Sequence, residues 1–288
     1  MKIGLNFGDA AVSWRADDTD AAGVARLKML YESVGMERFP DDGNATCRII
    51  PRSDFAPGRG VGIPRHAMRV DFSEAAERGA EVAFSDTATA PEELELTRWR
   101  GVRKLLFLGL VPRMMSMDCS MVHGALLERD GRGMLLCGPS GIGKSTTAGR
   151  MKAEGFKVLA DDCFLLRRSA EGKYFARPLP TWSIYLFGKE ALAECDARRE
   201  LSISRIFILG RSAERYTPLD AQTALLGCAK AFTDMVQWHI MRYPEPLGGA
   251  LLDRALAAAE RLVRELPCGA LQLTLDCNIS RLLPDLDR

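Results

Sequence analysis

Residues 138–145 read Gly-Pro-Ser-Gly-Ile-Gly-Lys-Ser and match the phosphate-loop pattern G-x-x-x-x-G-K-S/T in full. Glycines at 138, 141 and 143 can take positive φ angles and bring backbone N–H groups close to phosphate oxygens. Lys144 offers a charge to the β- and γ-phosphates, and the Ser145 hydroxyl is a candidate Mg²⁺ ligand. The predicted nucleotide contacts are Gly138, Ser140, Gly141, Ile142, Gly143, Lys144, Ser145 and Thr146, the last as a candidate for the α-phosphate.

A phosphate loop works only between a strand and the amino end of a helix, and both flanks are present in the sequence. Residues 134–137 form an apolar run typical of a buried strand. Residues 145–154 have a helix-compatible composition, and Gly155 is suited to end that helix. We therefore expect a strand, a phosphate-binding loop and a helix in this order.

A second apolar strand is predicted at 156–160, and it ends in Asp161 and Asp162. Carboxylates at the end of a strand beside a phosphate loop are placed for metal ligation and for nucleophile activation. Neighbouring strand residues face opposite sides, so both can serve only if the chain turns there. We expect one to be a Mg²⁺ ligand and the other a general base, the alternative being two solvated turn aspartates.

The residues before the loop predict an antiparallel neighbour for its strand. Residues 121–128 have a strand pattern, and Asp130-Gly-Arg-Gly133 is a hairpin turn signal. Counting back from that turn places His123 about level with Ser140. A histidine is therefore expected beside the phosphate site.

Together, His123-Gly124, the loop at 138–145 and Asp161-Asp162 resemble the HPr kinase/phosphorylase family, most closely its smaller relatives of the lasso-peptide precursor kinase type. The resemblance covers roughly residues 118–182, and the strand predicted at 201–209 looks like a later part of the same domain. It implies ATP and Mg²⁺ as cofactors, Asp161 as base and Lys144 on the phosphates. It also implies Asp162 and Ser145 at Mg²⁺, and His123 as an orienting or substrate-side residue.

The chain departs from this family in one region. We find no match to the family's second signature, and Gly210–Arg215 occupies roughly its place. The resemblance therefore does not extend to the phosphorylase reaction or to the hexamer, and homo-oligomerisation is left open. The first 95 residues do not look like the HPr-kinase N-terminal domain, so HPr need not be the substrate.

The fold class expected is α/β, a phosphate-loop domain of the HPr-kinase/PEP-carboxykinase-like type with a mixed sheet, plus a small N-terminal α+β domain. The expected domains are residues 1–95 for substrate or partner binding, a connecting helical segment at 96–117, and a catalytic domain at 118–288. The elements expected in the N-terminal domain are a helix from about Asp20 to Gly35, a loop at 51–64 and strands near 67–72 and 80–84. Those expected in the catalytic domain are strands near 201–209 and 270–275, a helix from Thr217 (N-cap) and Pro218 to about Ile240, and an amphipathic helix at 250–266.

Three arginines are further phosphate candidates. Arg177 precedes a rigid Pro-rich loop, where a phosphoryl clamp or a structural role are both open. Arg205 and Arg211 bracket a strand predicted in the catalytic half.

Composition excludes several classes of partner and location. With 39 Lys and Arg against 38 Asp and Glu, the net charge is +1, so we expect no nucleic acid and no membrane partner. The longest apolar run, 105–111, is far shorter than the roughly 20 residues of a membrane span. The eight cysteines include no CxxC pair and predict reduced thiols in a cytoplasmic protein.

These observations predict a Mg-ATP-dependent kinase that phosphorylates a serine, or less favourably a threonine, on a peptide or small protein. Two alternatives stay open. One is a kinase for a small molecule such as free serine, and the other is a non-catalytic ATP-binding switch that controls partner binding.

Overall fold

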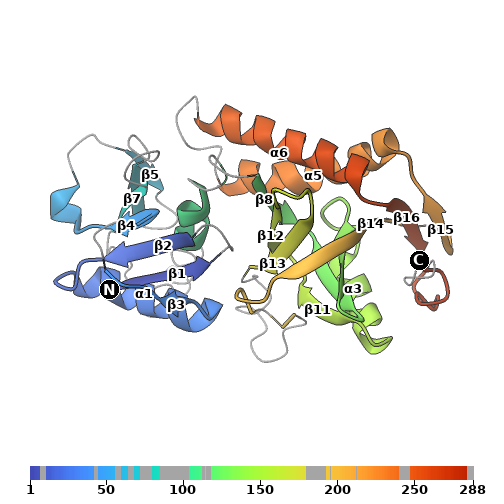
Figure 1. Ribbon diagram of the computed structural model, residues 1–288, viewed down its shortest axis with the longest axis horizontal. Helices are drawn as coiled ribbons and strands as arrows, with labels where there is room; N and C mark the ends of the chain where they lie inside the picture. The colour runs from blue at the N-terminus through green and yellow to red at the C-terminus, as the bar shows by residue number, and fades with distance from the viewer. Residues whose placement is uncertain are drawn as a thin grey trace. The chain divides into compact units, whose positions relative to one another are not determined.

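The chain folds into two compact units (Figure 1). One comprises Met1–Met117 with Arg242–Leu247, and the other comprises Asp118–Met241 with Gly248–Arg288. The computed structural model describes residues 1–6, 11–41, 45–55, 60–63, 68–71, 80–84, 104–111, 114, 118–179, 193–194, 196–211, 213–239 and 247–283. Within the segment expected to connect the two domains, residues 104–111 are helical, and most of the rest lies outside the described residues.

The N-terminal unit is built on a seven-stranded mixed sheet in the order β3-β1-β2-β4-β7-β6-β5. Its strands are β1 (Lys2–Asn6), β2 (Ala11–Ala16), β3 (Glu37–Arg38), β4 (Cys47–Ile49), β5 (Val61–Ile63), β6 (Met68–Asp71) and β7 (Ala80–Phe84). β4 pairs in parallel with β2 and β7, and the other neighbours are antiparallel. The predicted loop at 51–64 is wrong in part, because it contains a short 3-10 helix η1 (Arg52–Asp54) and β5.

The helix expected from about Asp20 to Gly35 is confirmed as α1 (Ala21–Val34). The Asp20 side chain accepts a hydrogen bond from the Gly23 N–H at 3.0 Å and caps the first turn. Gly35 ends the helix with a φ of 68°, a left-handed conformation that glycine adopts without strain. Leu27 and Leu30 are fully buried, as the apolar stripe of the sequence requires.

The C-terminal unit contains a nine-stranded sheet system that joins β11-β9-β10-β14-β13-β12-β8, with β16 paired to β14 and β15. The strands are β8 (Cys119–His123), β9 (Ala125–Arg129), β10 (Arg132–Cys137), β11 (Lys157–Ala160), β12 (Cys163–Arg168), β13 (Tyr174–Pro178), β14 (Leu201–Arg211), β15 (Arg215–Pro218) and β16 (Cys268–Leu273). The helices are α3 (Lys144–Ala153), α5 (Ala221–His239) and α6 (Leu247–Glu265). Mixed α/β architecture is confirmed.

The strand that leads into the phosphate loop has an antiparallel neighbour on one side and a parallel neighbour on the other. β9 and β10 form the predicted hairpin, with Arg132 opposite Arg129 and positive φ angles at Asp130 and Gly131 in the turn. β10 pairs in parallel with β14, and β14 in parallel with β16. The carboxyl ends of β10, β14 and β16 therefore lie at one edge of the sheet, where ligands of α/β sheets bind.

The single strand expected over 121–128 is wrong, because the chain breaks at Gly124 into β8 and β9. β8 pairs with β12, whereas β9 pairs with β10 and β11. A Cβ at Gly124 would lie 2.9 Å from the Leu136 carbonyl oxygen, so glycine is needed at the break. Counting along one strand to place His123 level with Ser140 therefore fails, and the pairing instead sets His123 opposite Cys163.

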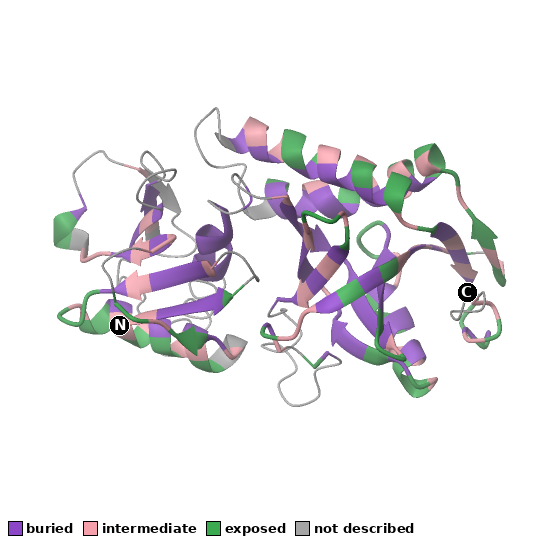
Figure 2. Cartoon of the chain, in the orientation of Figure 1, coloured by how far each residue is buried: buried purple, intermediate pink, exposed green. Residues whose placement is uncertain are grey.

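The beginnings of the two long helices also differ from expectation. Thr217 and Pro218 belong to β15, and α5 begins after Asp220, whose carboxylate accepts from the N–H and the hydroxyl of Thr223 at 2.9 and 2.8 Å. An aspartate therefore caps this helix in place of the predicted threonine. The amphipathic α6 starts at Leu247, three residues before the predicted 250, and Figure 2 shows buried and exposed residues alternating along it.

In the described parts of the chain, none of the helices combines the length and apolar character needed to cross a membrane. Seven of the cysteines are described, and all seven are buried free thiols, as expected of small hydrophobic residues. The eighth, Cys195, lies outside the described residues.

Arg177, one of the phosphate candidates, takes part in an ion-pair network within the sheet. Glu200 accepts from Arg167 at 2.8 and 2.7 Å and from the Arg177 Nε at 3.1 Å. Burial alone would raise the pKa of Glu200, but the bonds and charges of the two arginines outweigh it and lower that pKa. The Arg177 side chain thus ties β13 to the segment before β14.

The pKa of Glu200 is lower in the folded state than in the unfolded state. The ionised Glu200 carboxylate therefore stabilises the fold at pH values above its unfolded-state pKa. This stabilisation is lost as the pH falls through its folded-state pKa. Glu200→Gln should lower the free energy of unfolding by about 2 kcal/mol at pH 7. Urea denaturation should show this difference shrinking on acidification.

The matched control is Glu260→Gln, which removes an exposed ion pair with Arg264. It should change stability by less than about 0.5 kcal/mol. Equal effects of the two substitutions, or a Glu200→Gln effect that persists in acid, would contradict the assignment.

Candidate functional site

The loop between β10 and α3 has the backbone that the sequence predicts. Gly138, Gly141 and Gly143 have φ angles of 148°, 77° and 105°. A Cβ at Gly138 would lie 3.2 Å from the Ile142 side chain and 3.4 Å from the Leu209 carbonyl oxygen. The loop is thus a tight turn whose glycines leave room for backbone N–H groups to approach an anion.

Lys144 points into this loop. Its Nζ donates to the Gly138 carbonyl at 2.9 Å and to the Pro139 carbonyl at 3.1 Å, and the side chain is buried. Burial lowers the pKa of the Lys144 ammonium, against the opposing charges of Asp162 and Asp234. The loop's interior therefore holds a partly desolvated cation on backbone carbonyls, which an anion can attract away.

The amino end of α3 is open to an anion. Its N-cap is Gly143, so no side chain caps the first turn. Ser145 and Thr146 are exposed there, and the Ser145 hydroxyl donates to the Asp161 carbonyl oxygen at 3.3 Å. A helix amino terminus with free polar groups favours negative charge, so phosphate fits at this end.

The break at Gly124 brings the predicted histidine to the predicted aspartates. The Gly124 N–H donates to the Asp162 carbonyl at 3.0 Å, and His123 Nδ1 lies 3.3 Å from Asp162 Oδ1. The Asp161 side chain is buried, whereas that of Asp162 is half-buried. The turn after β11 thus places His123 against the Asp162 carboxylate, and it brings the Asp161 backbone carbonyl to the Ser145 hydroxyl at the amino end of α3.

These residues fit Mg²⁺ and a nucleoside triphosphate as ligands. Oxygen ligands of the kind Mg²⁺ prefers are offered by Ser145 and Asp162, with Asp161 next to them. Among the described residues, no three His, Cys, Asp or Glu side chains gather into a metal site. Magnesium at phosphate sites commonly uses one or two carboxylates and completes its shell with phosphate oxygens and water, so two protein ligands suit it.

A cavity of about 350 Å³ lies beside the loop, at the carboxyl ends of β14 and β16. Leu209 and Leu273 give it apolar surface, while Thr146 and Arg211 give it polar groups. Its lining is Ile142, Gly143, Thr146, Thr147, Arg150, Leu209, Gly210, Arg211, Leu273, Thr274 and Leu275. The cavity adjoins Thr146, which the sequence predicts as the α-phosphate contact. It is therefore placed to hold the nucleoside that an α-phosphate carries.

Of the other two phosphate candidates, the structure brings Arg211 to the loop and not Arg205. Arg211 donates from Nε to the Ile142 carbonyl and from Nη2 to the Gly141 carbonyl, both at 2.9 Å. Arg205 lies opposite Met134 on β10, within the body of the sheet and not at its carboxyl edge.

Two charged residues of α5 were missed in the sequence. Asp234 is 1% exposed, and its Oδ1 accepts from Lys230 Nζ at 2.5 Å. Both charges act on the ammonium of Lys144, with Asp234 raising its pKa and Lys230 lowering it. The sequence offers only a Lys–Asp pair four residues apart, a spacing common on exposed helix faces, so nothing there marks it as part of the site.

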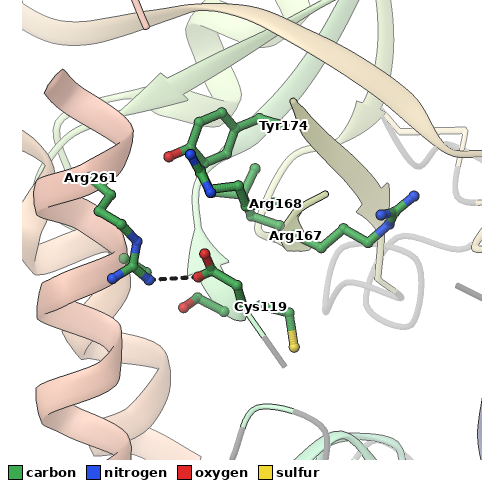
Figure 3. Close-up of a pocket in the computed structure, with 9 residues that line it drawn as sticks. Cys119, Arg167, Arg168, Tyr174 and Arg261 are labelled. Atoms are coloured by element: carbon green, nitrogen blue, oxygen red, sulfur yellow. Dashed lines mark hydrogen bonds and ion pairs between the residues drawn. The ribbon is translucent and has the colours of Figure 1, made fainter. Parts of the chain in front are cut away.

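A second pocket lies at the far end of β8 and β12, lined by Asp118, Arg168, Tyr174 and Arg261 among others (Figure 3). Arg261 donates to Asp118 at 2.6 Å, and the Tyr174 hydroxyl donates to Glu265 at 2.9 Å. Its volume of about 10 Å³ holds about one water. The antiparallel register places this end four residues from His123, so the pocket is a separate polar cluster.

Comparison with known proteins finds HPr kinase/phosphorylases among the relatives of this chain. An HPr kinase/phosphorylase of Geobacillus sp. (strain WCH70) is 45% identical over 147 residues, which are 49% of this chain and 40% of that protein. An HPr kinase/phosphorylase of Lactobacillus delbrueckii subsp. bulgaricus is 37% identical over 94 residues, 32% of this chain and 26% of that protein. The chain thus spans less than half the length of these relatives. The resemblance to this family is confirmed.

A solved structure, that of the Hpr(Ser) kinase/phosphatase from Coxiella burnetii, matches 56% of this chain and 84% of its own at 14% identity, with a TM-score of 0.31. That value is too low to define the fold.

The family model for the SynChlorMet cassette protein ScmC matches residues 98–282. Since this is well over half of the 288 residues, the chain belongs to the ScmC family.

Proposed function

We propose that this protein is a Mg-ATP-dependent kinase that transfers the γ-phosphoryl group to a serine hydroxyl of a peptide or small protein. The observation that supports the proposal is the His123–Asp162 pair next to the bond from the Ser145 hydroxyl to the Asp161 carbonyl, at the end of the loop that holds Lys144. The names of the relatives support a kinase, and the description of the family as a cassette protein supports a substrate encoded nearby.

The nucleotide is held by the loop and by the cavity beside it. Backbone groups of residues 138–143 surround the phosphates, Lys144 neutralises their charge, and Thr146 contacts the α-phosphate. Ser145 and Asp162 hold Mg²⁺. The nucleoside lies in the 350 Å³ cavity, whose apolar surface from Leu209 and Leu273 suits a base.

When bound, Mg-ATP supplies the phosphoryl group to be transferred. Asp161 would accept the proton of the acceptor hydroxyl as the hydroxyl oxygen bonds to the γ-phosphorus and the bond from that phosphorus to the β–γ bridging oxygen breaks, which releases ADP. His123 positions Asp162 by lying against its carboxylate. Lys144 then stabilises the charge that develops on the phosphate oxygens, and positioning with charge neutralisation supplies most of the rate.

Removing the loop cation should abolish function. Lys144→Ala is expected to lower the transfer rate by on the order of 10³ and to weaken ATP binding, because it removes the ammonium that bonds the carbonyls of Gly138 and Pro139 inside the loop. The measurement is phosphate transfer followed by mass spectrometry, with ATP affinity from titration calorimetry. Lys152→Ala, an exposed lysine of the same helix, is the control and should leave both unchanged. Wild-type turnover by Lys144→Ala would refute the proposed function.

The two aspartates should separate into different roles. Asp161→Asn keeps the shape of the side chain but removes the base, so transfer should fall by about 10²–10⁴ while ATP affinity stays within about twofold. Asp162→Asn should instead raise the Mg²⁺ concentration for half-maximal activity by about tenfold or more. Steady-state kinetics over a Mg²⁺ series distinguishes them.

The acceptors to test are peptides encoded beside the gene, with free serine in parallel. Transfer to free serine alone would replace the peptide by a small-molecule substrate. The protein could instead bind ATP without transfer to any acceptor and bind a partner only when ATP is present. This result would identify an ATP-dependent switch and contradict the kinase assignment.

A further inference from the structure

Arg211 reaches the phosphate loop because of strand pairing. It is the last residue of β14, which runs parallel to β10 with Ile208 opposite Cys137, the last residue of β10. β14 continues for three residues past this pair, so Arg211 lies beside the loop that follows Cys137. The guanidinium then donates to two successive carbonyls, those of Gly141 and Ile142, each at 2.9 Å.

Holding these carbonyls fixes the direction of the loop's N–H groups. In a trans peptide unit the C=O and the N–H point to opposite sides. With the carbonyls of Gly141 and Ile142 turned to Arg211, the N–H groups of Ile142 and Gly143 must turn the other way. The structure agrees, because the Ile142 N–H is directed to the Pro139 carbonyl at 3.3 Å, on the side where Lys144 Nζ also bonds Pro139.

The loop is therefore held by two cations on different carbonyls. Lys144 bonds Gly138 and Pro139 from inside, and it must leave them to reach a phosphate. Arg211 bonds the other two carbonyls from outside, and nothing in phosphate binding requires it to leave. A Cβ at Gly143 would lie 3.5 Å from Arg211 Nη2, which shows how closely the guanidinium follows the loop.

We propose that Arg211 is a positioning residue of the phosphate loop, acting through the carbonyls of Gly141 and Ile142 to hold the turn at Ile142 and to aim the Gly143 N–H at the polyphosphate. The inference rests on the proposed function in that the loop must bind a polyphosphate. This positioning role requires arginine, because the planar guanidinium presents a fork of donors that spans two carbonyls, whereas a lysine ammonium offers one compact point of charge.

The test compares two ligands on the full-length protein. Titration calorimetry with Mg²⁺ measures the affinity of ATP and of inorganic tripolyphosphate for wild type, Arg211→Ala, Arg211→Lys and the control Arg168→Ala. Arg168 also makes a bidentate contact, but with Glu265 at the opposite end of the sheet. Thermal unfolding of each variant reports whether the fold is intact.

If Arg211 acts through the loop, Arg211→Ala weakens both ligands by the same factor, about tenfold, because the loop serves the phosphates and not the nucleoside. Arg211→Lys recovers only part of the loss, and Arg168→Ala loses nothing. The unfolding temperature of the Arg211 variants stays at the wild-type value.

Three results would overturn the inference while leaving the kinase proposal intact. A loss confined to ATP would make Arg211 a direct contact of the nucleoside in the cavity. Full recovery by Arg211→Lys would mean that charge alone matters, and unchanged affinities would remove any role in binding. Failure of the wild type to bind either ligand would instead refute the proposed function, and the inference with it.

Discussion

One backbone hydrogen bond joins the two halves of the site, the bond from the Gly124 N–H to the Asp162 carbonyl. It lies where β8 gives way to β9 and where β11 turns toward β12, so it ties the histidine side of the site to the aspartate side. Together with the β8–β12 pairing that sets His123 opposite Cys163, it holds His123 Nδ1 3.3 Å from Asp162 Oδ1. Only glycine fits at the break, because a side chain would collide with the Leu136 carbonyl.

The arrangement of charge follows from the same topology. Parallel pairing of β10, β14 and β16 sets their carboxyl ends together, which places the loop, Arg211 and the cavity at one edge. Lys144 is partly desolvated in the loop and is balanced by the charges of Asp162 and Asp234. A near-neutral chain thus concentrates charge of both signs at one place, which its overall balance of +1 does not reveal.

Local patterns in the sequence predicted the parts of the site that depend on neighbouring residues. The strand, loop and α3, the β9–β10 hairpin and the turn at Asp161-Asp162 all follow from turn residues and apolar runs. The break at Gly124 could not be predicted, because a strand pattern covers residues on both sides of it and the clash that requires glycine comes from Leu136, a residue on another strand. The sequence offers Arg177 and Arg211 equally as phosphate candidates. In the fold, Arg177 bonds Glu200, whereas Arg211 bonds carbonyls of the loop, and only the pairing of distant strands decides this difference. Asp234 could not be predicted as part of the site for the same reason, because its place near Lys144 depends on tertiary packing and not on its neighbours in the sequence.

The central claim is that the gathered loop, lysine and aspartates transfer phosphate to a serine. Its most direct test is to incubate the full-length protein with Mg-ATP and the peptides encoded beside its gene and to map phosphate by tandem mass spectrometry. For the wild type we expect one phosphoserine on a peptide, with an equal amount of ADP formed. ADP release or ATP binding with no phosphate on any acceptor would contradict it.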